Sequence, residues 1–169
     1  MILEYKGKKP FLNNIAMEAP GCTIIGDVTI DEDSSIWFGA VVRADVAQVK
    51  IGRRTNIQDN ATVHVVQGRG TIIGNEVTVG HNAVVHACTI GDRCLIGMGS
   101  VVLDNAEIGE GSVVGAGALV TQGKKFPPKS LIIGNPARAV RTISDEQYNQ
   151  LIQSAETYVN LAKETAKSL

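Results

Sequence analysis

Aliphatic residues recur at every sixth position along much of the chain. The longest run continues for six members without a gap: Ile90, Ile96, Val102, Ile108, Val114 and Val120. Three shorter runs keep the same spacing, namely Ile30, Ile36, Val42; Ile51, Ile57, Val63; and Ile73, Val79, Val85. This period matches neither the helical repeat of about 3.6 residues nor the two-residue alternation of a simple strand. It predicts a short strand followed by a corner, repeated three times in each coil of a solenoid.

The composition agrees with such a core. Hydrophobic residues make up 44% of the chain, aromatic residues only 4%, and 18 residues are glycine. Stacked coils bury one aliphatic column along each of three faces, so a core can form almost without aromatic side chains. The repeat resembles that of the hexapeptide-repeat family over roughly residues 15–137. This resemblance implies an all-β solenoid, a left-handed parallel β-helix; the handedness comes from the resemblance, because parallel crossovers are normally right-handed.

The length of 169 residues fits one domain. We expect residues 1–137 to form the β-helix with an N-terminal extension, and residues 138–169 to form a C-terminal α-helix of the same domain. Ser144 and Gln147 have the spacing of a capping box at the start of that helix. An apolar stripe is predicted to pack the helix along the β-helix: Tyr148, Leu151, Ile152, Ala155, Val159, Leu161 and Ala162.

Charge and cysteine content argue against several classes of function. Sixteen basic and 17 acidic residues leave a net charge of −1, without a long run of one sign that could bind nucleic acid or a membrane surface. The N-terminus lacks the apolar core of a signal peptide, and no segment is apolar enough to span a bilayer, so we expect a cytoplasmic protein. Cys22, Cys88 and Cys94 lack paired spacing and fit reduced core or turn residues better than disulfides or metal ligands.

The six-residue spacing is interrupted at residues 43–50 and 64–70, where extra residues are predicted to bulge out of the coil. Interruptions of a solenoid often contain binding groups. The chain has only three histidines, His64, His81 and His86, and all of them lie within 23 residues of sequence. We therefore expect the three imidazoles to share one task.

The spacing also predicts where the histidines lie on the coil. His64 follows Val63 and His86 follows Val85, so both are expected on one face, one coil apart. Adjacent coils are separated by about 4.8 Å, and a zinc–nitrogen bond is about 2.1 Å long, so two such imidazoles can bind one cation. His81 lies two residues after Val79, on a different side of the coil. A third ligand is therefore expected from a neighbouring subunit.

Arg43 and Asp59 belong to the same two columns. Arg43 follows Val42 and extends the column of His64 and His86, while Asp59 lies one coil below His81. If neighbouring subunits bring the two columns together, Arg43 and Asp59 can form an ion pair across the same interface. We group Asp45 with this predicted interface ion pair.

Several segments resemble the γ-class carbonic anhydrases more closely than a general hexapeptide protein. They are Arg43-Ala44-Asp45, Asn56-Ile57-Gln58-Asp59, His64, and Gly80-His81-Asn82-Ala83-Val84-Val85-His86. The resemblance implies a homotrimer in which His64 and His86 of one subunit and His81 of the next bind zinc, or alternatively iron or cobalt. Three neutral imidazoles leave a coordination position open for water, as in catalytic zinc sites.

The resemblance further implies reversible hydration of CO2 to bicarbonate by a metal-bound hydroxide. Gln58 is similar to the residue that orients the hydroxide, and Tyr158-Val159-Asn160 resembles a C-terminal segment that contributes Tyr158 and Asn160 to the site. Two loop glutamates of the type enzyme, one of them implicated in proton transfer, align with Val46 and Gln67. Because each hydration must export a proton, we expect a slow enzyme.

Two other functions fit the same sequence. A hexapeptide-repeat acyltransferase shares the coil and often the ending Ile133-Gly134-Asn135-Pro136-Ala137, but its catalytic histidine usually acts as a base without two partner histidines. A metal-binding relative of the γ class with little or no turnover is the other alternative. Assays of CO2 hydration, of acetyl-CoA consumption and of metal content distinguish the three.

Overall fold

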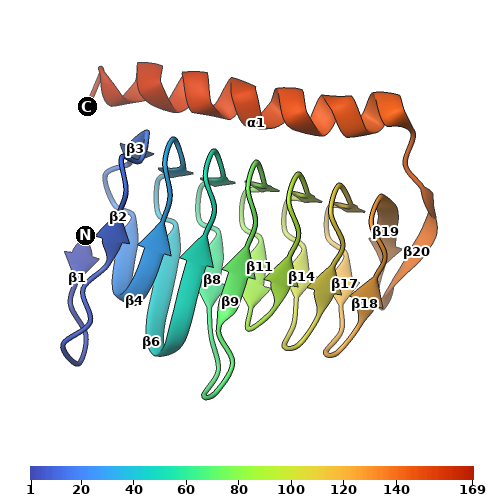
Figure 1. The fold of residues 1–169 in the computed structure, drawn as a ribbon, viewed down its shortest axis with the longest axis horizontal. Helices are drawn as coiled ribbons and strands as arrows, with labels where there is room; N and C mark the ends of the chain where they lie inside the picture. The colour runs from blue at the N-terminus through green and yellow to red at the C-terminus, as the bar shows by residue number, and fades with distance from the viewer.

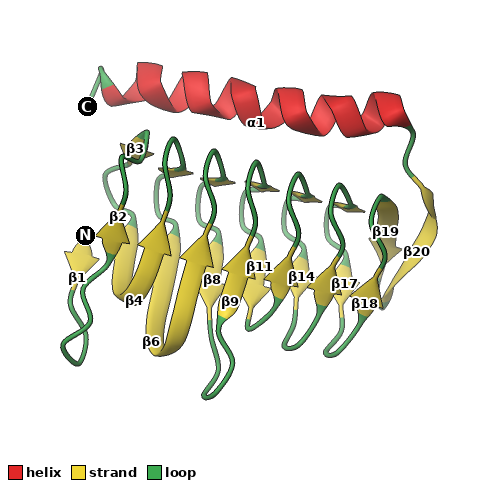
Figure 2. Ribbon diagram, viewed as in Figure 1, coloured by secondary structure: helices red, strands yellow, loops and turns green.

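The computed structural model describes residues 1–169, which form a parallel β-helix of about seven turns with one α-helix along its side (Figure 1 and Figure 2). The predicted fold class, a parallel β-helix with a C-terminal helix packed along it, is therefore confirmed. With one late exception, each strand pairs in parallel with its neighbours one coil away. No helix of the structure is long and apolar enough to cross a membrane.

Most of the strands are only two or three residues long. The first coils contain β1 (Ile2–Leu3), β2 (Phe11–Leu12), β3 (Met17–Glu18), β4 (Thr23–Ile30), β5 (Ser35–Ile36) and β6 (Val41–Ile51). The middle coils contain β7 (Asn56–Ile57), β8 (Thr62–His64), β9 (Thr71–Ile73), β10 (Thr78–Val79), β11 (Val84–His86) and β12 (Thr89–Ile90). The last coils contain β13 (Leu95–Ile96), β14 (Val101–Val102), β15 (Glu107–Ile108), β16 (Val113–Val114), β17 (Leu119–Val120), β18 (Lys125–Phe126), β19 (Ser130–Gly134) and β20 (Ala137–Thr142).

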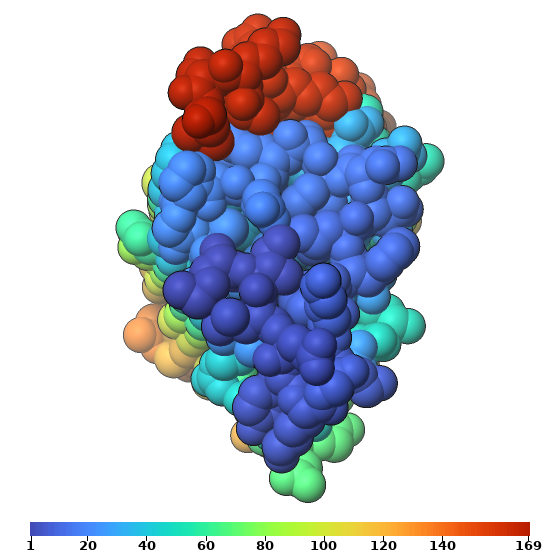
Figure 3. All heavy atoms as spheres, turned by 90° about the vertical axis from the view of Figure 1, so that its left-hand side faces the viewer, coloured from blue at the N-terminus to red at the C-terminus, as the bar shows by residue number.

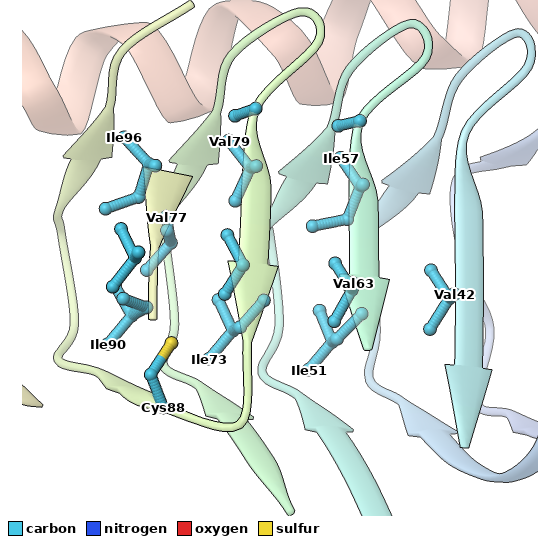
Figure 4. Packing of buried hydrophobic residues seen from close by; sticks show 14 of the residues in the cluster. Val42, Ile51, Ile57, Val63, Ile73, Val77, Val79, Cys88, Ile90 and Ile96 are labelled. Atoms are coloured by element: carbon cyan, nitrogen blue, oxygen red, sulfur yellow. The ribbon is translucent and has the colours of Figure 1, made fainter. Parts of the chain in front are cut away.

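The residues of the six-residue repeat form three buried columns. One column contains Ile30, Ile51, Ile73, Ile90 and Ile108. The second contains Ile36, Ile57, Val79, Ile96, Val114 and Ile132. The third contains Ile24, Val42, Val63, Val85, Val102 and Val120. Each of these side chains is at most 2% exposed, and Figure 4 shows how neighbouring coils stack them. The predicted aliphatic core is confirmed.

The two interruptions of the repeat differ in structure. Residues 43–50 lie within the continuous strand β6, but its register with β4 shifts there: Ala44 pairs with Gly26 and Val49 with Val28, so residues 45–48 stand opposite a single residue of β4. Residues 64–70 protrude as a hairpin closed by two backbone hydrogen bonds between Val66 and Arg69 (Figure 1). The prediction of a bulge is therefore confirmed for the second interruption, and the register shift agrees with it at the first.

The N-terminal extension continues the β-helix. β1 and β2 both pair in parallel with β4, in register with Ile24 and Ile30. Residues 5–8 form a short hairpin. In Figure 3, which views this end of the molecule, the dark blue N-terminal residues form part of the surface that faces the viewer.

The C-terminal segment begins with a strand and not with a helix. β20 pairs antiparallel with β19, and α1 (Asp145–Ala166) follows it. Ser144 is the N-cap, and the predicted capping box with Gln147 is present. The helix buries Leu151, Ala155, Val159 and Ala162, whereas Leu161, expected in the apolar stripe, is exposed. α1 runs back from the last coil to the first, beside the sheet that contains β3, β5, β7 and β10 (Figure 1).

Candidate metal centre

His64 and His86 lie side by side on adjacent coils, as predicted. They end β8 and β11 and are direct register partners in the parallel ladder. Val63 and Val85 point into the core, so the following residue of each strand points outwards. The two rings face each other with centroids 5.1 Å apart, and Nδ1 of His64 lies 3.1 Å from Nε2 of His86.

A carboxylate fixes the second nitrogen of each ring. Nε2 of His64 lies 3.1 Å from Oδ1 of Asp45, and Nδ1 of His86 lies 2.5 Å from Oδ1 of Asp104. An ionised carboxylate can only accept hydrogen bonds, so these two ring nitrogens are the donors. Asp45 and Asp104 therefore set the tautomer of each histidine, an arrangement typical of metal-binding imidazoles.

The two nitrogens that face each other are then both without a proton when the rings are neutral. Two lone pairs at 3.1 Å repel each other unless a proton or a cation lies between them. Two imidazoles on a tetrahedral zinc, with bonds of about 2.0–2.1 Å, place their nitrogens about 3.4 Å apart. A separation a few tenths of an ångström larger than the one observed is within reach of small ring rotations. The pair therefore fits a divalent cation such as zinc.

Arg43 adds a positive charge beside this pair. Its guanidinium donates to Asp45 Oδ2, while the other oxygen of the same carboxylate accepts from His64. Burial acts to raise the pKa of Asp45, but the hydrogen bond from His64 and the charge of Arg43 outweigh it, so the pKa lies below its ordinary value. Asp45 is thus ionised at neutral pH and remains an acceptor. Within one chain Asp45, and not Asp59, is the partner of Arg43.

His81 lies at a different corner of the coil, between β10 and β11. Its Nδ1 is 2.8 Å from Oδ2 of Asp59, which confirms the prediction that Asp59 lies beneath it one coil away. By the same argument as above, Nδ1 is the donor and Nε2 keeps a lone pair. A single chain contains no group of three His, Cys, Asp or Glu side chains that could bind one metal ion. A site with three histidine ligands therefore requires more than one subunit.

Gln58 and Tyr158 lie near the His81 corner. Gln58 immediately precedes Asp59 and is buried, and its Nε2 donates to Oδ1 of Asn56 at 3.0 Å. Asn56 in turn donates to Oγ1 of Thr78 at 3.1 Å, so a buried polar chain orients the Gln58 carboxamide. Gln58 and Tyr158 line the same cavity beneath α1.

Tyr158 and Asn160 differ in their surroundings. The ring of Tyr158 packs edge-on against Trp37 with centroids 5.6 Å apart. Burial, and then the negative charge of Asp59, raise the pKa of Tyr158, so the phenol is neutral. Asn160 is exposed on α1, and its side chain forms no hydrogen bond within the chain. The structure therefore brings Tyr158 and Gln58 together and leaves Asn160 outside their cavity.

Asp104 is the site residue that the sequence did not predict. It lies in the turn after β14, one coil beyond His86, and Asn105 in the same turn has a positive φ of 60°. A carboxylate in the coil next to a predicted histidine ligand was the available signal. The three cysteines are free and buried, and burial raises the pKa of both Cys88 and Cys94 to about 12, so these two thiols are protonated at neutral pH.

Comparison with known proteins supports the six-residue repeat. Two protein-family sequence models match the chain. The family described as bacterial transferase hexapeptide (six repeats) matches residues 87–122, and the family described as hexapeptide repeat of succinyl-transferase matches residues 48–87. A solved structure from Bacillus cereus, provisionally described as an acetyltransferase, is 43% identical with a TM-score of 0.97 and covers 100% of this chain and 98% of its own.

Curated relatives are named for another activity. Carbonic anhydrase from Geobacillus kaustophilus is 46% identical over 94% of this chain and 87% of its own length. Gamma carbonic anhydrase 1, mitochondrial, from Arabidopsis thaliana is 45% identical over 96% of this chain, which spans only 62% of that relative. The identity over most of the bacterial relative, together with the paired histidines, shows that the chain belongs to the γ-class carbonic anhydrase family of hexapeptide-repeat proteins.

Proposed function

We propose that this chain assembles into a homotrimer that catalyses the reversible hydration of CO2 to bicarbonate at metal sites between subunits. His64 and His86 of one subunit and His81 of the partner subunit would hold the metal, zinc or alternatively iron or cobalt. The observation that supports this most strongly is the hydrogen bonding of the three histidines. In each one, the N–H of one ring nitrogen donates a hydrogen bond to a carboxylate, and the other ring nitrogen keeps its lone pair for a metal. Three imidazoles prepared in this way leave a fourth position open, as in catalytic sites.

The residues of the chain divide the work of such a site. A bound zinc supplies a Lewis acid that lowers the pKa of water to about 7. Asp45 and Asp104 hold the His64 and His86 rings in the ligating tautomer. Gln58, oriented through Asn56, presents its carboxamide oxygen as an acceptor for water at the corner of His81. Tyr158, neutral and half-buried, can donate to an oxygen of the substrate.

Proton export is expected to limit the rate. Val46 and Gln67, which occupy the positions of the type enzyme's loop glutamates, are both exposed and have no titratable group. Asp45 and Asp104 are already hydrogen-bonded to the histidines and are therefore poor relays. We propose a measurable but slow hydratase with about one metal ion per subunit.

Mixed trimers test the shared site directly. One variant lacks both paired ligands, His64→Ala with His86→Ala, and the other lacks only His81. Each variant alone should form trimers without a complete site. In a mixed trimer, one interface of the three brings intact His64 and His86 against an intact His81 of the partner subunit. Co-expressed and purified, the pair should recover up to one metal ion per trimer and a matching share of hydratase activity.

Mixed trimers that bind metal no more tightly than either parent would refute the intersubunit assignment. A stable metal-bound monomer in light scattering would do the same. The related structure described as an acetyltransferase makes acetyl-CoA consumption the second assay to run on the metal-loaded protein. Acetyl transfer without CO2 hydration would replace the proposed activity.

A further inference from the structure

A cavity of about 380 Å³ lies between α1 and the β-helix, outside the histidine pair. It is bounded by the sheet side of the coils and by Ser154 and Tyr158 of the helix. Gly80 and Gln58 are also part of its wall. Gly80 directly precedes His81, and Gln58 directly precedes the aspartate that holds His81, so the cavity opens beside this ligand.

The lining of the cavity is apolar and uncharged. Its apolar side chains include Leu95, Val113 and Met98, and no Lys, Arg, Asp, Glu or His is among the lining residues. Met98 lies at the rim and is 60% exposed. A bicarbonate ion would lose its hydration in such a space without gaining a cation, whereas CO2, which has no charge and no hydrogen to donate, loses little.

The histidine pair has the opposite surroundings. Asp45 contacts the His64 ring and Arg43, and Asp104 contacts the His86 ring. The side of the site that holds the histidine pair is therefore charged and partly open to water. An anionic product is better solvated there than in the cavity. The two sides of the proposed site therefore differ in the form of the substrate that they favour.

We propose that the cavity beneath α1 is a loading chamber that concentrates CO2 next to His81, while bicarbonate leaves through the charged side. This inference rests on the proposed hydratase function. The volume is several times larger than a triatomic molecule needs, so the chamber raises the local concentration of dissolved gas and does not fix one orientation. Orientation is left to Gln58 and Tyr158 at its inner wall.

Gas-pressurised crystals and a filled cavity test the proposal. Crystals of the metal-loaded protein under xenon, and separately under CO2, should show gas density between Leu95 and Tyr158. Ser154→Phe should abolish that density and lower kcat/KM for CO2 about fivefold to tenfold, with little change in kcat or metal content. Ala116→Leu, on the opposite wall, repeats the test without altering the helix. Gln153→Phe, on the exposed side of α1, is the matched control and should change none of these values.

Three results would overturn the proposal. One is a trimer structure in which side chains of the partner subunit fill the cavity. Another is wild-type crystals without gas density there. The third is equal kcat/KM for both phenylalanine variants and the wild type. If gas fills the cavity but the metal-loaded protein has no hydratase activity, the proposed function fails and the loading role fails with it, which separates that result from a failure of the cavity alone.

Discussion

The two parts of the proposed metal site are held in different ways. His64 and His86 end two paired strands, directly above the aliphatic column of Val63 and Val85, and each ring is fixed by its own carboxylate. His81 lies in a corner, and its side chain is 35% exposed and fixed by Asp59 alone. The pair is therefore organised within one chain, whereas the third ligand is a single group that awaits a partner.

The difference indicates how such a site depends on assembly. Two ligands at fixed separation lose little freedom when they bind a cation, so the pair should retain weak affinity on its own. In the proposed trimer, His81 would contribute only where subunit contacts bring it to the pair. Under that proposal, folding of one chain prepares the two paired ligands and association adds the third.

Removing one member of the pair should have the largest effect. His86→Ala leaves His64 without its neighbour, so we expect loss of tight metal binding and a fall in hydratase activity of about three orders of magnitude or more. His81→Ala should keep weak binding by the remaining pair. Elemental analysis and calorimetric metal titration measure both, and circular dichroism should show an intact β-helix because the core is aliphatic. Equal residual affinity in the two variants would contradict the comparison.

Substituting the carboxylates that hold the histidines should have the next largest effect on metal affinity, and the effect should differ between the pair and His81. Asp104→Asn removes the charge of the carboxylate that accepts from Nδ1 of His86, and we expect metal affinity to fall about 10- to 100-fold. Asp59→Asn should cost less, because the His81 corner is more exposed and less constrained. Competition with a chelator of known affinity measures each. A larger loss of metal affinity for Asp59→Asn than for Asp104→Asn would show that metal binding depends more on the orientation of His81 than on that of His86.

The His81 corner should matter more for the substrate than for the metal. Gln58→Ala removes the oriented carboxamide, and we expect kcat/KM for CO2 to fall about tenfold while metal content is unchanged. Asn56→Ala should give part of the same loss, since Asn56 only orients Gln58. Stopped-flow hydration assays with parallel metal analysis test this. Loss of metal in Gln58→Ala would assign Gln58 to the metal instead.

The smallest expected effect concerns proton transfer. Because no titratable side chain replaces the loop glutamates at Val46 and Gln67, added imidazole should accept protons from the site and raise kcat severalfold near pH 7. A buffer of similar pKa that is too bulky to enter the interface is the control. A rate independent of buffer concentration would show that the chain already contains a proton relay, either beside the His64–His86 pair or at the His81 corner.

Much of this arrangement could be predicted from the sequence, and the reason is geometric. A six-residue period fixes which side chains stack, so the columns of Ile57 and Val63, and with them the register of His64 with His86, follow from counting. The same counting placed Asp59 beneath His81. These predictions needed no knowledge of the turns.

The predictions that failed or were missing depend on turns and strand ends. Asp104 reaches His86 through a turn whose conformation, with Asn105 at positive φ, the repeat does not encode. Residues 45–48 stand opposite a single residue of β4, and the repeat did not indicate that they would continue as one strand, β6. The interface role of Asp45 stays a prediction; within the chain Asp45 bridges Arg43, two residues away, and His64, on the next coil, a contact that the repeat alone did not indicate.

The return of α1 along the whole β-helix affects how the protein unfolds. Repeat arrays can lose their end units one at a time, because each unit touches only its neighbours. Here Lys163 pairs with Asp33 near the first coils, and Lys129 pairs with Asp145 near the last. The C-terminal end of α1 therefore lies beside the first coils, as the positions of the two termini show (Figure 1). The helix ties the array into one cooperative unit, so fraying of either end requires its release.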